Sequence, residues 1–161
     1  MTSQIVPGER AATVTVVTRR IETTPGVLFL CLHNSGRSQM AAGWLRHLAG
    51  DAVRVLSAGS EPGEAVNPAA VAVMAEVGID IAGAQPRRWT SEMGADVDVV
   101  VSMGCGDECP VVPGTRLLDW ELPDPAGQGP DMVRGVRDDI EVQVRLLLDE
   151  ILDREVADRW P

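Results

Sequence analysis

The stretch Val27-Leu-Phe-Leu-Cys-Leu-His-Asn-Ser-Gly-Arg-Ser38 decides how this chain folds. Its first four residues form a short apolar run, which is typical of a strand that is buried on both faces. Apolar residues at helical spacing begin near Gln39 and continue to about His47. The sequence therefore predicts a strand, a tight loop and a helix N-terminus in immediate succession.

The loop between this strand and this helix has the composition of an anion-binding site. The first turn of a helix presents unpaired N–H groups, and successive loop amides can close into a concave nest for a negative charge. Asn34 and Gly36 tolerate the backbone angles that such a nest needs. We therefore expect an oxyanion to bind the backbone of Leu32, His33, Asn34, Ser35 and Gly36.

Three side chains give this loop its chemistry. Arg37 carries a planar guanidinium suited to bidentate contact with a tetrahedral oxyanion. Cys31 stands where a thiol would face that anion, and the surrounding positive charge favours its nucleophilic thiolate form. Ser38 is placed to hydrogen-bond the sulfur. A lone cysteine at a strand end is often just buried and inert, but the Cys-x5-Arg-Ser spacing between strand and helix favours the nucleophile.

Length and charge limit the classes of protein to consider. The chain has 161 residues, of which 45% are hydrophobic, which predicts one domain with a sizeable core. Its formal net charge of −10 disfavours nucleic acid and anionic membranes as partners. Neither a secretory signal nor a run long enough to span a membrane is visible, so we expect a cytoplasmic protein, either monomer or homodimer.

Strand and helix patterns alternate along the rest of the chain. Further strands are predicted at 53–57, 97–101 and 115–118, and helices after Asn67, after Thr90 and over 131–154. This order predicts an α/β fold, a single three-layer domain in which helices cover both faces of a four-stranded parallel sheet. We place the domain at 25–155, with an N-terminal extension at 1–24 (a strand arm or a mobile segment) and a tail at 156–161.

Cys105 and Cys109 follow the third predicted strand, on a loop where open α/β sheets place their sites. Half of a zinc site is one reading, but no cluster of Cys or His completes it, so we expect no metal. Two inert thiols are another reading. A third cysteine in the anion loop and the glycines around Cys105 favour redox use. On a helix their Cβ atoms would lie about 5–6 Å apart, so a disulfide would require the segment to unwind.

Asp124 precedes Pro125, so its backbone is extended or in a turn. A carboxyl group on such a loop can reach over the anion site and protonate a leaving oxygen. Aspartate is also common in turns before proline, and the sequence leaves both roles open.

Together these residues resemble the arsenate reductases built on the low-molecular-weight tyrosine phosphatase fold. The resemblance covers about residues 27–152 and leaves 1–24 outside it. Its motifs, in the family's order, are Cys31-Leu-His-Asn-Ser-Gly-Arg-Ser-Gln-Met-Ala41, Ser57-Ala-Gly59, Val66-Asn-Pro68, Gly78-Ile-Asp-Ile81, Met103-Gly-Cys105 with Cys109-Pro110, and Asp124-Pro-Ala-Gly127.

The resemblance implies a reaction for arsenic detoxification with no bound cofactor. Cys31 attacks arsenate, which Arg37 and the loop amides hold, and Asp124 protonates the departing hydroxyl. Cys105 then attacks the sulfur of Cys31 and releases arsenite. Cys109 takes over the disulfide, which thioredoxin reduces.

This chain departs from the family pattern at two places. Only three residues separate Cys105 from Cys109, fewer than in better-known members. Some members bind potassium beside the anion loop. Asn34 and Ser57 match that site, but Ala42 stands where those members have a glutamate, so we expect no such site.

Several functions remain open at this point. Related reductases use mycothiol and mycoredoxin with Cys31 alone, although the presence of both further cysteines favours thioredoxin. A tyrosine phosphatase needs Cys31, Arg37 and Asp124, but it usually holds the substrate ring with aromatic residues, and Trp120 is the only candidate near the acid loop. A non-catalytic oxyanion sensor would have no use for Asp124 or for two more thiols.

Overall fold

A four-stranded parallel sheet forms the centre of the computed structural model, which describes residues 24–104 and 113–159. Its strands are β1 (Gly26–Cys31), β2 (Arg54–Gly59), β3 (Val99–Ser102) and β4 (Arg116–Asp119), in the order β2-β1-β3-β4. All three neighbouring pairs are parallel, as the alternation of strands and helices predicts. β1 is paired on both sides and every one of its residues is buried.

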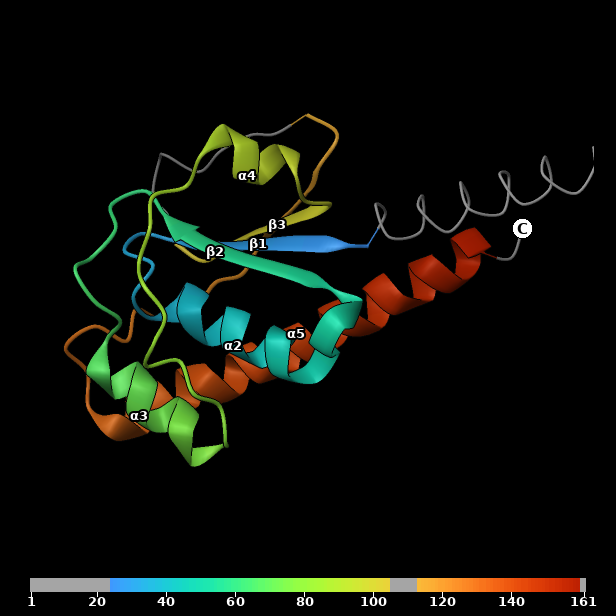
Figure 1. Cartoon of the computed structure of the whole chain (residues 1–161). Helices are drawn as coiled ribbons and strands as arrows, with labels where there is room; N and C mark the ends of the chain where they lie inside the picture. The colour runs from blue at the N-terminus through green and yellow to red at the C-terminus, as the bar shows by residue number, and fades with distance from the viewer. Residues whose placement is uncertain (1–23, 105–112, 160–161) are drawn as a thin grey trace, which may run out of the picture.

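Helices cover both faces of this sheet (Figure 1). On one face lie α2 (Arg37–Ala49), α3 (Pro68–Glu76) and the long α5 (Pro130–Arg159), and on the other lies the short α4 (Ser91–Ala95). A single 3-10 turn, η2 (Gly50–Ala52), follows α2. The predicted three-layer α/β architecture is therefore confirmed.

Side chains of β1 alternate between two hydrophobic clusters. Phe29 and Cys31 belong to the larger one, which they share with α2, α3 and α5. Leu28 and Leu30 belong to the smaller one, against which Met93 of α4 packs. Because side chains alternate along a strand, this pattern sends the Cys31 side chain toward the α2 face.

Most element boundaries differ from the sequence prediction by one or two residues, and three of the differences stand out. α2 begins at Arg37 and not near Gln39, so the basic residue of the motif belongs to the first helical turn. β3 begins two residues later than predicted, at Val99. α5 continues beyond residue 154 to Arg159, through a charged stretch of good helix formers.

The carboxyl ends of the strands place the candidate site. The loops that follow β1, β3 and β4 all leave the same edge of the sheet, because the strands are parallel. The predictions for the N-terminal extension and for Cys105 and Cys109 fall outside the described residues. Within 24–104 and 113–159, no helix combines the length and the apolar character needed to cross a membrane.

Candidate active site

The loop after β1 is held by its carbonyl groups. Amides of the segment 61–67 donate to the carbonyl oxygens of Leu32, His33 and Ser35 at 2.8, 2.9 and 2.7 Å. In a trans peptide the next N–H points opposite to the carbonyl, and no described peptide bond is cis. The N–H groups of residues 33, 34 and 36 therefore point away from the 61–67 segment.

Gly59, the last residue of β2, packs closely against the main chain of this loop. A Cβ atom at Gly59 would lie 2.7 Å from the Leu32 oxygen and 2.9 Å from the Asn34 nitrogen, both main-chain atoms that cannot give way. Asn34 itself has a φ of 50°, a left-handed conformation that asparagine tolerates better than most residues. The loop thus requires a glycine at position 59, and its left-handed turn suits an asparagine at position 34.

Cys31 is the last residue of β1 and stands at the base of the loop. Its side chain is buried, and its Sγ lies 2.9 Å from Oγ of Ser38 in the first turn of α2. Nδ2 of Asn34 donates to the same Ser38 oxygen at 2.7 Å. Sulfur, hydroxyl and carboxamide therefore form one continuous chain of polar contacts.

A second set of contacts fixes Asn34 from the other side. Its Oδ1 accepts from the main-chain N–H of Arg87 at 3.0 Å and from Nε2 of Gln39 at 3.2 Å. Gln39 also donates to the Asn34 carbonyl oxygen at 3.0 Å. Sequence reasoning assigned no role to Gln39 or to the 85–89 segment, because a glutamine near a helix start reads as a surface residue, whereas this one is buried.

Arg37 is the point at which the three strand-end loops meet. Its guanidinium donates from Nη1 to the carbonyl oxygen of Leu122 at 3.3 Å, and its Nη2 lies 3.7 Å from Oδ2 of Asp124. A Cβ atom at Gly104 would lie only 2.6 Å from Nη1. The loops after β3 and β4 therefore enclose an arginine from the first turn of α2.

Asp124 uses its two oxygens differently. Oδ1 accepts from the Ala126 N–H at 3.0 Å, which is the contact of a turn aspartate, while Oδ2 faces Arg37. The carboxyl group is about half exposed, and the next residue, Pro125, lies 3.1 Å from the position of a Cβ at Gly36. The turn role is therefore present, and the acid role stays a prediction.

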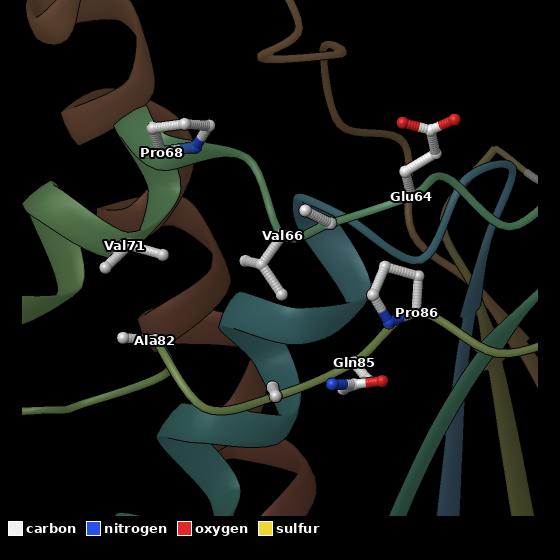
Figure 2. A pocket seen from close by; sticks show the side chains of 9 residues that line it. Glu64, Val66, Pro68, Val71, Ala82, Gln85 and Pro86 are labelled. Atoms are coloured by element: carbon white, nitrogen blue, oxygen red, sulfur yellow. The ribbon is translucent and has the colours of Figure 1, made fainter.

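Two cavities flank the site. One of about 430 Å³ is lined by Gly104 and residues 119–123 and opens beside Arg37. The other, of about 380 Å³, lies between the start of α3 and the 82–86 segment, and Figure 2 shows mainly small apolar side chains around it, with Glu64 at one end. Only the first cavity adjoins the residues predicted to carry chemistry.

The atoms near Asn34 and Ser57 do not suit a potassium ion. Oδ1 of Asn34 already accepts two hydrogen bonds, and the Ser57 carbonyl oxygen accepts one from Nε of Arg87 at 3.2 Å. Ala42 is fully buried and has no side-chain oxygen. A guanidinium beside the expected ligands would moreover repel a second cation.

Comparisons with known proteins agree with this geometry. A glutaredoxin arsenate reductase of Synechocystis sp. is 40% identical over 128 residues, which make up 78% of this chain and 97% of that protein. A thioredoxin-dependent arsenate reductase of Corynebacterium glutamicum has a similar structure, with a TM-score of 0.72 and 40% identity over 80% of this chain and 62% of that one. A structure of an arsenate reductase in the phosphate binding state aligns with a TM-score of 0.69 and 36% identity, over 79% and 98% of the two chains.

The match to a family model extends over nearly all of the described domain. Residues 26–158 match the model for low molecular weight phosphotyrosine protein phosphatases, from the first strand to the end of α5. The resemblance found in the motifs is thereby confirmed: the chain belongs to the low molecular weight phosphotyrosine protein phosphatase family, among relatives that are arsenate reductases.

Proposed function

We propose that this protein is an arsenate reductase that converts arsenate to arsenite with Cys31 as the nucleophile. The observation that carries the proposal is the placement of Cys31 Sγ beside Ser38 at the base of the loop whose Arg37 also faces Asp124. This chain is also 40% identical to two proteins that are named arsenate reductases.

Binding is the first step of the proposed reaction. The N–H groups of the loop 32–36, of which those of His33, Asn34 and Gly36 point away from the 61–67 segment, bind three oxygens of the tetrahedral anion together with the Arg37 guanidinium. A relative whose structure is described in a phosphate binding state supports a tetrahedral oxyanion as ligand. Local donors matter because the chain as a whole carries a net charge of −10.

Nucleophilic attack follows. The Cys31 thiolate forms a bond to arsenic, and an arsenic–oxygen bond breaks as Asp124 gives its proton to the leaving hydroxyl, which departs as water. Ser38 donates a hydrogen bond to the sulfur. The contact between Arg37 and Asp124 supports this assignment, because it holds the carboxyl group at the rim of the anion site.

Thiol exchange completes the cycle. The Cys105 thiolate attacks Sγ of Cys31, the electron pair of the sulfur–arsenic bond stays on arsenic, and arsenite leaves as arsenic(III). Cys109 then attacks Cys105, and the resulting disulfide is reduced by thioredoxin. The thioredoxin-dependent relative supports this reductant, while the relative named for glutaredoxin supports glutaredoxin as an alternative, and mycothiol with mycoredoxin is a further alternative. Such a cycle suits the reducing cytoplasm.

A tyrosine phosphatase on the same scaffold is less well supported. Trp120, the aromatic residue nearest the acid loop, is 8% exposed and packs against Phe29 with ring centroids 5.8 Å apart. Its ring therefore packs mainly into the core, and Trp120 contributes only this small exposed part to the lining of the cavity beside Arg37.

The test is arsenate-dependent oxidation of NADPH by the purified chain with thioredoxin and thioredoxin reductase. We expect turnover with the wild type and none with Cys31→Ser, because an alcohol is a far weaker nucleophile than a thiolate. Parallel assays with glutaredoxin and glutathione, with mycothiol and mycoredoxin, and with p-nitrophenyl phosphate separate the alternatives. Phosphatase turnover without any arsenate-dependent oxidation would refute the proposal.

A further inference from the structure

The direction of the hydrogen bond between Ser38 and Cys31 follows from the contacts around Asn34. Oδ1 of Asn34 accepts from the main-chain N–H of Arg87 and from Nε2 of Gln39, at 3.0 and 3.2 Å. Both partners are donors, so this end of the carboxamide must be the oxygen. The amide nitrogen is thereby turned toward Ser38, 2.7 Å away.

Ser38 has one hydroxyl hydrogen to give. Because its oxygen accepts from Asn34, that hydrogen is free to point at Cys31 Sγ, 2.9 Å away. A donor aimed at the sulfur favours the thiolate over the thiol. Ser38 and Asn34 are both fully buried, so water does not compete for these contacts.

We propose that Gln39 is a positioning residue that sets the direction of the hydrogen bonds from Asn34 to Ser38 and from Ser38 to Cys31, a chain of contacts that we call the relay. In this way Gln39 promotes ionisation of Cys31. Gln39 does not touch the substrate site. Its Nε2 holds both oxygens of Asn34, the carboxamide oxygen and the main-chain oxygen, the latter at 3.0 Å, and it also reaches the Gln85 carbonyl oxygen at 3.5 Å. It thus fixes the side chain and the left-handed backbone of the same residue.

Gln39 is suited to this role by its place in α2. It is the third residue of the helix and only 2% exposed, so its side chain folds back under the loop and not into solvent. Glutamine carries two N–H hydrogens on one nitrogen, which can serve two acceptors at once. An apolar residue of the same length would fill the space but would leave the Asn34 carbonyl without this donor.

The inference rests on the proposed role of Cys31, but it can be measured without arsenate. Cys31 becomes the only thiol when Cys105 and Cys109 are both changed to serine, because the chain has three cysteines. The rate of Cys31 alkylation by iodoacetamide, followed by intact mass over a pH series, then reports thiolate formation directly. Absence of arsenate turnover in the wild type, with normal Cys31 alkylation in this background, would refute the proposed function and leave this inference standing.

In that background we expect Gln39→Met to raise the pH midpoint of alkylation by about 0.5–1 unit, which is a three- to tenfold loss of thiolate below the midpoint. In a Ser38→Ala background the same change should have no further effect, because the relay is already broken. A through-space or packing effect of Gln39 would persist there. Equal shifts in both backgrounds, or no shift in either, would overturn the proposal.

Two further variants test whether a shift in the alkylation midpoint reflects the relay and not a general loss of folding. Met40→Leu changes the next residue of α2, which is also fully buried, and should leave the midpoint unchanged. Gln39→Asn keeps a carboxamide that is one methylene too short to span both Asn34 oxygens, so it should shift the midpoint upward even if Gln39→Met does not fold. An unshifted, folded Gln39→Asn variant would also count against the inference.

Discussion

At the scale of single residues, Gly104 controls the position of Arg37. Its φ is +83°, and a Cβ there would lie 2.6 Å from Nη1, closer than real contacts allow. Gly104→Ala should therefore push the guanidinium out of line with the oxyanion. A misplacement of this size in an active site can cost about 10²-fold, and we expect a loss of that order in kcat/KM for arsenate.

Gly114→Ala is the matched control for this prediction. Gly114 has nearly the same backbone conformation, φ +80°, but nothing lies within 4 Å of its added Cβ. An alanine is strained to a similar degree at either position, so both variants should show a similar decrease in melting temperature. Equal kcat/KM values for the two variants would show that Gly104 does not act through Arg37.

The residues of the site differ in how far the sequence could predict them. Cys31, Arg37 and Ser38 lie within eight consecutive positions, so a local motif between a strand and a helix is enough to bring them together. Nothing in the sequence indicated the role of Gln39, and the sequence pointed to Gly104 only as a flexible neighbour of Cys105, because the contacts of both residues are three-dimensional. Gly104 is 67 positions from Arg37 in the sequence, and only the parallel pairing of β1 with β3 brings them into contact.

At the scale of elements, α3 links the anion loop to α5. Asn67 accepts from the Ala69 N–H at 2.9 Å as the N-cap of α3, and its own main-chain N–H holds the Ser35 carbonyl at 2.7 Å. At the other end of α3, Glu76 accepts from Arg134 and Arg137 of α5. The helix is therefore fixed at both ends, and the loop gains a rigid support.

The Glu76 cluster makes α3–α5 docking dependent on pH. Hydrogen bonds from Arg134, with a further contribution from Arg137, lower the pKa of Glu76 from 4.5 to about 2. A carboxyl group whose pKa is lower in the folded state stabilises that state above its unfolded pKa. That contribution is complete above pH 4.5 and is lost as the pH falls toward 2.

We therefore expect Glu76→Gln to lower the urea midpoint above pH 4.5, with a difference from wild type that shrinks progressively toward pH 2. Titration of the Glu76 carboxyl carbon by NMR should show the matching low midpoint in the wild type. Glu92→Gln, on the short α4, serves as the control for removing a surface charge. A difference that does not change with pH would exclude linkage through this carboxylate.

Elements were more predictable than their ends. The buried run before Cys31 and the capped start of α3 have strong local signals, and both elements lie where the sequence predicts them. α5 is longer than predicted because the amphipathic pattern fades after residue 151 while the backbone continues as a helix of charged residues. The spacing of apolar residues indicates which side of a helix packs on the core, and it cannot mark the end of a helix that extends beyond that core.

At the scale of the whole molecule, parallel topology gathers the reaction at one edge of the sheet. β1 leads to the loop of the proposed nucleophile Cys31, β3 leads to Gly104, and β4 leads to the loop of the proposed acid Asp124. In the sequence Cys105 directly follows Gly104, the residue that lies against Arg37. Cys109 is four positions further along the sequence.

This order predicts distinct trapped species for the two thiols. We expect Cys109→Ser to complete one turnover and to accumulate a Cys31–Cys105 disulfide, because no further thiol can resolve it. Cys105→Ser should stall before that disulfide forms. The measurement is peptide mapping after one equivalent of arsenate without reductant, with Cys31→Ser as the control in which no arsenate-dependent disulfide appears.

The alternative orders give different maps. A Cys31–Cys109 disulfide in the wild type, with Cys105 dispensable, would reverse the order of the relay. If both single variants turned over normally with mycothiol, the small thiol would be resolving the Cys31 adduct itself, and Cys105 and Cys109 would be bystanders. The sequence favours the first map, because Cys105 directly follows the glycine that lies against Arg37, whereas Cys109 comes four positions later.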